Sequence, residues 1–232
     1  MKPAGLLVLL CGALGAQTSW ELLMAEGTEA LEKGSYLKAE RYFEMALPAA
    51  ANRSREAITL VRLGLVWERQ EQWARAEGYY TRALAVGEEE HEATALEHLA
   101  RVLRKAGRQT EAEEKQARAF AIRAARIAAA STATPAAEVV PIREAGAAPQ
   151  LIHRIDPEYS VEARLARHGG SVELSVDIGL DGRVHNVRLE RSLGLGLDEK
   201  AVEAVEQWRF KPGFRGQPVT VRAKVTVHFR LL

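Results

Sequence analysis

The pattern of apolar and polar positions changes once along the 232-residue chain and divides it into two halves. Residues 19–130 form amphipathic segments crowded with Ala, Glu, Leu and Arg, which is a helical pattern and composition. After residue 150 the apolar residues alternate with polar ones, which is the spacing of strands with one buried face. The sequence therefore predicts a helical half followed by an α+β half.

The helical half contains an internal repeat. Residues 34–47 (GSYLKAERYFEMAL) and 71–84 (EQWARAEGYYTRAL) align without gaps, so that Ala39 and Ala76 match at a distance of 37 residues. A weaker third copy at residues 107–120 lacks the aromatic residues. Each copy follows another amphipathic segment, and these segments carry a small residue at the matching position: Gly27, Gly64 and Ala100. The pattern predicts helix–turn–helix units in which small residues allow close approach and aromatic residues fill the space beside them.

These units resemble the tetratricopeptide repeat, whose period is about 34 residues. The resemblance implies about three repeats over residues 19–130, and a plain helical bundle is the alternative. In such arrays the first helix of each repeat lines a concave surface that holds peptides or proteins. The residues expected to face that surface are Met24, Thr28, Val61, Leu65, Glu68, Arg101 and Arg104. An array of three repeats also serves as a spacer or a dimerisation unit, and the sequence names no ligand.

The second half predicts a three-stranded antiparallel sheet with two helices. Its strands are expected at residues 171–178, 184–192 and 219–232, with a hairpin turn at Asp181-Gly182. The helices are expected at Ser160–Arg167 and Asp198–Trp208. Because the strands alternate, we expect one face of the sheet to be covered by the helices and the other to be exposed to water.

An Ala- and Pro-rich stretch separates the two halves. It has few large apolar residues, so it cannot build a core, and it predicts a semi-extended linker over residues 131–149. The α+β domain is then expected at residues 150–232.

The motifs of residues 150–232 resemble, in their order, the C-terminal domain of the energy transducer TonB. Pro157 and Tyr159 precede the first helix, and Gly170 opens a strand. The sequence WRFKPG follows at residues 208–213, and Gly216-x-Pro218 precedes the last strand. One departure is that Ser160 follows Tyr159, where the family often has proline.

The resemblance implies a function in binding rather than catalysis. Domains of this family lie in the periplasm and bind the box peptide of an outer-membrane transporter, which adds as a strand to the edge of the sheet. The matching edge strand contains Val219, Val221, Arg222, Lys224, Val225, Val227 and Phe229. Two alternatives are open: an exported repeat scaffold or adaptor without a role in energy transduction, and a homodimer paired through the same edge.

The first 16 residues have the layout of a signal peptide. Lys2 is followed by an apolar run from Leu6 to Leu14 and then by small residues, which predicts cleavage and a periplasmic protein. An uncleaved segment is the alternative, and it would anchor the chain in the inner membrane near the motor proteins of energised transport.

Composition and motifs exclude several other functions. The net charge of +1 argues against nucleic acid as a partner, and the single cysteine, Cys11, cannot form an intrachain disulfide. His91 and His98 lack the spacing of a metal motif, so we expect no metal site. No nucleophile and base lie in a recognisable pattern, so we expect no catalytic residues and no cofactor.

A Gly-x-Gly turn at Gly194 and Gly196 is the start of a phosphate-binding pattern. Glu199 stands where the third glycine belongs, and Asp198 places a carboxylate where an anion would bind. The glycines are therefore expected to turn the chain and not to hold a phosphate.

Overall fold

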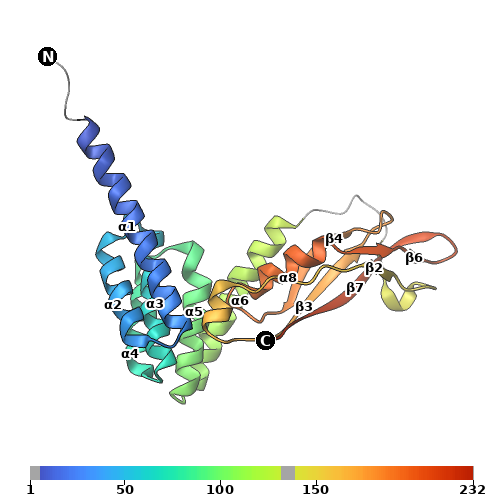
Figure 1. The fold of residues 1–232 in the computed structure, drawn as a ribbon. Coiled ribbons are helices and arrows are strands. Elements are labelled where there is room, and N and C mark those ends of the chain that lie inside the picture. The colour runs from blue at the N-terminus through green and yellow to red at the C-terminus, as the bar shows by residue number, and fades with distance from the viewer. Residues whose placement is uncertain (1–5, 132–138, 232) are drawn as a thin grey trace. The chain divides into compact units, whose positions relative to one another are not determined.

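The computed structural model describes residues 6–131 and 139–231, which form two compact units (Figure 1). The first unit ends at Ala119 and the second begins at Phe120, so the boundary lies within one helix. Residues 1–5 of the predicted signal peptide lie outside the described residues, and the rest of that segment belongs to the first helix. Within the described part of the chain, no helix combines the length and the apolar character needed to cross a membrane.

The first unit is a series of helices joined by short turns. The helices are α1 (Leu6–Glu32), α2 (Tyr36–Ala46), the 3-10 helix η1 (Leu47–Ala49), α3 (Arg53–Arg69), α4 (Trp73–Val86), α5 (Glu89–Lys105) and α6 (Gln109–Ala130). Helices α1 and α2 pack as one hairpin and α3 and α4 as the next, as the repeat pattern predicts. The last turns of α6, from Phe120, belong to the second unit.

Contacts between glycine and an aromatic ring hold the first two hairpins together. Phe43 and Tyr80 are completely buried. A Cβ atom added at Gly27 would lie 2.5 Å from the Phe43 ring, and one added at Gly64 would lie 2.5 Å from the Tyr80 ring. Only glycine allows these helices to come so close, which confirms the predicted role of the small residues.

The second unit is built around a sheet. Its elements are β1 (Val139–Pro141), the 3-10 helix η2 (Ile142–Glu144), β2 (Gln150–His153), α7 (Val161–Leu165), β3 (Gly170–Ile178), β4 (Val184–Arg191), α8 (Leu197–Glu206), β5 (Arg209–Lys211), β6 (Gly213–Phe214) and β7 (Pro218–Phe229). Strands β7, β3 and β4 are adjacent and antiparallel, as predicted.

The sheet is larger than the predicted three strands. β1 pairs in parallel with β7, and β6 pairs with the start of β7. β2 and β5 form a separate two-stranded antiparallel ribbon. Strand β1 lies inside the segment predicted as a linker, because three residues in an Ala- and Pro-rich stretch give no alternation that a sequence pattern can show.

Helix α8 covers one face of the sheet by packing on β3 and β4. Its buried residues Ala201 and Val205 face a core that includes Leu174 and Val176. The opposite face is not uniformly exposed to water, because Asp177 of β3 is fully buried. Alternation predicts which side of the strand Asp177 occupies, but not that neighbouring side chains cover it.

Candidate partner-binding surfaces

The outer side of β7 is only partly covered by other strands. β3 pairs with its inner side, β1 pairs with its outer side from Thr220 to Arg222, and β6 pairs with Pro218 and Val219 at its start. In the part of the chain that the structure describes, no strand pairs with the outer side from Ala223 to Phe229. We call this stretch the open edge.

The predicted edge residues divide between the two parts of β7. Three of them lie where β6 or β1 already pairs: Val219, Val221 and Arg222. An added strand cannot pair with the outer side of Thr220–Arg222, because β1 already occupies it. β1 is a strand that the sequence pattern does not predict. The other four lie on the open edge: Lys224, Val225, Val227 and Phe229.

The open edge is straight and well supported. β7 pairs with β3 without a register shift, from Gly170 opposite Phe229 to Ile178 opposite Val221. Val227 and Phe229 point into the core, while Lys224 is exposed. The core side chains hold the strand in place and leave its outer backbone groups available for hydrogen bonds.

The other edge of the sheet, along β4, is interrupted. Asn186 has a positive φ of 46°, and the register between β3 and β4 shifts at two places. The Ser131 hydroxyl also accepts a hydrogen bond of 2.7 Å from the backbone N–H of Val187. Bulges and capped N–H groups hinder the addition of a strand. The open edge of β7 is therefore a better site than the β4 edge for the addition of a strand.

An ion pair between the buried Asp177 and the exposed Arg222 ties β7 to β3 next to the open edge. Arg222 donates hydrogen bonds to Asp177 through Nε at 2.7 Å and Nη2 at 3.0 Å, and Asn186 donates another at 2.9 Å. Burial raises the pKa of Asp177, but the hydrogen bonds and the charge of Arg222 outweigh it, so this pKa lies below its usual value. Arg222 is thus engaged within the domain.

The Gly-x-Gly turn is occupied by a side chain of the protein itself. Asp198 is fully buried in the first turn of α8 and accepts hydrogen bonds from the N–H groups of Leu193, at 2.8 Å, and Gly194, at 3.2 Å. The Ser192 hydroxyl donates to the same carboxylate. The turn therefore satisfies an internal carboxylate where a phosphate would otherwise bind.

The residues predicted to line the concave repeat surface are mostly in the interior. Those that are buried are Met24, Val61, Leu65 and Glu68. Thr28 and Arg101 are half-buried, and Arg104 is exposed. Neighbouring helices cover the buried four, which a pattern within one helix does not reveal, and their side chains are not accessible to a partner.

Glu68 is instead the centre of a buried polar network. Its carboxylate accepts hydrogen bonds from Tyr80 Oη at 2.7 Å and from His98 Nδ1 at 2.9 Å, and Arg101 Nη2 lies 3.1 Å away. The rings of Tyr80 and His98 are stacked at 5.0 Å. Burial raises the pKa of Glu68, but the charges of His98 and Arg101 and the hydrogen bonds lower it to about 2. The network therefore joins α3, α4 and α5 around an ionised carboxylate.

The histidines do not form a metal centre. His98 is bound within the Glu68 network, and His91 Nε2 lies 3.0 Å from the Ser54 hydroxyl. Among residues 6–131 and 139–231, no group of His, Cys, Asp and Glu side chains is arranged to hold a metal ion.

Comparison with known families assigns both units. Residues 155–231 match the family model described as the Gram-negative bacterial TonB protein C-terminal. These residues are therefore similar to TonB C-terminal domains and form a TonB-like domain. Residues 55–125 match a tetratricopeptide repeat model, so the TonB-like domain follows a repeat-like region.

Curated relatives match less than half of the chain. The chain is 34% identical over 104 residues to Protein TonB of Klebsiella pneumoniae, which is 44% of this chain and 40% of that protein. It is 36% identical over 77 residues to Protein TonB of Xanthomonas campestris pv. campestris, which is 32% of this chain and 34% of that protein. The chain thus spans well under half the length of these relatives.

Two solved structures are similar to parts of this chain. The TPR domain of Arabidopsis FLU matches with 21% identity and a TM-score of 0.43, over 46% of this chain and 95% of that one. The Pseudomonas aeruginosa TonB CTD matches with 20% identity and a TM-score of 0.30, over 42% of this chain and 96% of that one.

Proposed function

We propose that this TonB-like protein works in the periplasm and binds an extended peptide of an envelope protein as an added strand on the open edge of β7. The box peptide of an outer-membrane transporter is the partner that the family resemblance implies, and energised transport is the process. The observation that carries the proposal is the uninterrupted stretch from Ala223 to Phe229, whose outer side pairs with no strand among the described residues.

Strand addition suits this edge for a physical reason. The affinity comes mainly from main-chain hydrogen bonds, so it needs a straight strand whose outer N–H and C=O groups are free. Pairing of β7 with β3 provides the straight strand. Beyond Pro141, the last residue of β1, the chain continues into η2, which also lies close to β7, and no described strand pairs with the rest of the edge. A bound peptide would continue the sheet next to β7.

Disulfide cross-linking tests the position of the peptide. The Thr226 side chain is exposed on the open edge, and an opposing residue on an added strand has its Cβ about 4.5–5.5 Å away, within reach of a disulfide. We expect Thr226→Cys, in a Cys11→Ser background, to cross-link a box peptide that carries one cysteine. The matched control is Arg188→Cys on the exposed side of β4. Equal cross-linking at both positions would contradict the proposal.

An exported adaptor without a role in energy transduction is the second candidate. The signal-like layout of residues 1–16 favours it, because cleavage would remove the segment that could reach the motor proteins in the inner membrane. Fractionation with intact-mass measurement separates the two candidates. A product without the first 15 or 16 residues in the soluble periplasm supports the adaptor, and the full-length mass in the inner membrane supports the transducer.

A further inference from the structure

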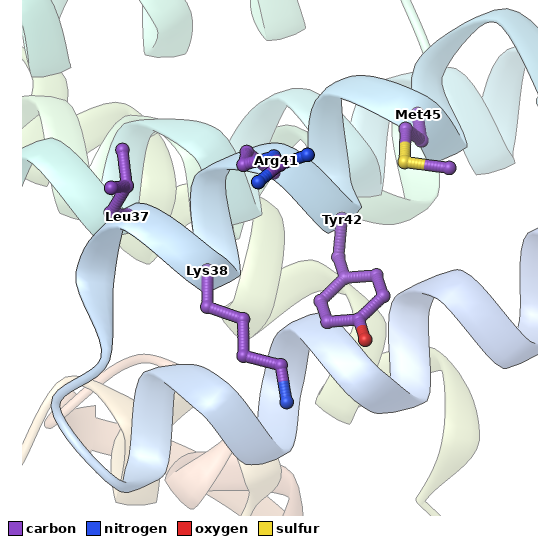
Figure 2. Close-up of a pocket in the computed structure, with 5 residues that line it drawn as sticks. All are labelled: Leu37, Lys38, Arg41, Tyr42 and Met45. Atoms are coloured by element: carbon purple, nitrogen blue, oxygen red, sulfur yellow. The ribbon is translucent and has the colours of Figure 1, made fainter.

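The outer side of the first repeat carries an exposed apolar and basic surface. We call it the end face, and it consists of Leu22 on α1 and of Leu37, Lys38, Arg41 and Met45 on α2. Leu22, Leu37 and Met45 are 62%, 73% and 57% exposed, and they are the exposed large apolar side chains of the first unit's described residues. Figure 2 shows the α2 part of the end face, where a pocket of about 400 Å³ is lined by Leu37, Lys38, Arg41, Tyr42 and Met45.

Comparison with the second repeat shows which side of the array the α2 part of the end face occupies. A shift of 37 residues relates Lys38 to Arg75 and Met45 to Arg82 on α4. In the second repeat, Arg75 and Arg82 line a groove together with Glu40, which lies on α2 of the preceding repeat. These positions of α4 therefore face the preceding repeat. The same positions of α2 face the place where a preceding repeat would pack.

Leu22, the α1 part of the end face, also corresponds to a position that faces the preceding repeat. Leu22 is related to Thr59 of α3 by the same 37-residue shift. Thr59 is fully buried, and its hydroxyl lies 3.1 Å from Trp20 Nε1 and 3.5 Å from the Met24 sulfur, both on helix α1 of the preceding repeat. Leu22 thus occupies a position that the array covers in its second repeat and leaves exposed in its first.

Repeat arrays normally end in a polar face, because an exposed stacking surface is apolar and associates with other molecules. In the part of the chain that the structure describes, no polar helix covers the end face. Its charges indicate the kind of occupant: Lys38 and Arg41 are exposed cations, and no ion pair joins either of them to another described residue.

The second repeat also shows which charges the occupant brings. Glu40 of α2 lines the same groove as Arg75, and the charge of Arg75 counteracts the rise in the pKa of Glu40 that burial and Glu44 cause. The helix that lies against Arg75 therefore presents a glutamate to it. A helix on the end face would meet Lys38 in the place of Arg75.

We propose that the end face binds an amphipathic helix of a partner protein, with leucine-like residues on one side and glutamates beside them, stacked as α2 is on the second repeat. Pairing of the end face with itself in a second copy would bring Lys38 and Arg41 close to the same cations, which is unfavourable. The end face lies in the repeat unit and makes no use of β7, so this inference is independent of the function proposed for the open edge.

A designed peptide pair tests the inference on the full chain. The probe is a helical 18-residue peptide with a leucine stripe flanked by glutamates, and its twin has lysine in place of glutamate. We expect the acidic peptide to bind with an affinity that falls at least tenfold in the Lys38→Glu/Arg41→Glu variant and in Leu37→Gln/Met45→Gln. The charge-reversed variant should bind the lysine twin instead.

Two controls make the outcome decisive. Arg53→Glu/Lys105→Glu changes the net charge equally on exposed residues of the first unit outside the end face and should leave binding unchanged. Helical circular dichroism checks that the variants fold. The inference is overturned if the twin binds as well as the acidic peptide, or if charge reversal on α2 has no effect. It is also overturned if sedimentation shows a dimer that Leu37→Gln/Met45→Gln dissociates, because the occupant is then a second copy.

Discussion

Gly64 and Tyr80 pack so closely that a Cβ atom on Gly64 would lie 2.5 Å from a ring carbon of Tyr80. The same relationship joins Gly27 and Phe43 one repeat earlier. The ring of Tyr80 is completely buried and its hydroxyl is bound to Glu68, so it cannot move aside at low cost. The repeat array therefore depends on a missing side chain at one position of each of its first two hairpins.

Gly64→Ala is expected to destabilise the repeat unit by about 1–3 kcal/mol. The steric clash with Tyr80 outweighs the gain in helix propensity, which is about 1 kcal/mol. Gly78→Ala on α4 is the matched control, since an added Cβ meets nothing within 4 Å there. It should be neutral or stabilising by up to about 1 kcal/mol. Urea unfolding followed by helical circular dichroism measures both, and equal effects of the two variants would contradict this account.

Glu68→Gln should remove a pH-dependent part of the stability. The pKa of the Glu68 carboxyl is about 2 in the folded protein, against a usual value of 4.5. The folded state binds this proton more weakly than the unfolded state, so the ionised carboxylate stabilises the fold above pH 4.5. This contribution, on the order of 3 kcal/mol, is lost as the pH falls from about 4.5 towards 2.

The measurement is the difference in unfolding free energy between wild type and Glu68→Gln as a function of pH. We expect a gap of about 3 kcal/mol at neutral pH that closes towards pH 2. Glu71→Gln, at an exposed turn position, is the control and should show no gap. A gap for Glu68→Gln that stays constant from pH 7 to pH 2 would show that the buried charge is not its cause.

Asp198→Asn should destabilise the TonB-like domain by about 3 kcal/mol. It replaces a buried carboxylate that accepts the N–H groups of Leu193 and Gly194, and it leaves Arg123, whose Nε lies 3.8 Å from that carboxylate, without this charge. Amide exchange of the buried β3 backbone reports the loss. Asp156→Asn, at an exposed pair with Arg154, is the control and should have little effect.

The same loop allows a ligand test. Because Asp198 fills the Gly-x-Gly turn, inorganic phosphate should not slow amide exchange at Leu193 or Gly194 in the wild-type protein. Protection by millimolar phosphate would contradict the internal role of this carboxylate.

Local patterns in the sequence were sufficient for much of the fold. The spacing of Gly27 and Gly64 relative to the aromatic residues predicted the tight hairpins, because both partners belong to one repeat. Strict alternation predicted β3 and β7, since each strand keeps one face in the core. The resemblance to TonB rests on motifs within one domain, and the family match confirms it.

Features that depend on distant parts of the chain were missed. The pairing of β1 with β7 joins residues about 80 positions apart in a stretch without strand-like alternation, and it covers Val221 and Arg222. The burial of Val61 and Leu65 results from packing against neighbouring helices. The end face had a signal in the sequence, since aligning the repeats places Lys38 with Arg75 and Leu22 with Thr59, but only the structure shows which side of the repeat is left uncovered.

Amide exchange along β7, with and without a transporter box peptide, tests the central claim most directly. The account predicts that the amides of Ala223–Phe229 that point away from β3 exchange rapidly in the free protein and slowly in the complex, while the amides of β4 do not change. Protection of β4 by the peptide, or bound peptide without new protection on the open edge, would contradict strand addition at β7.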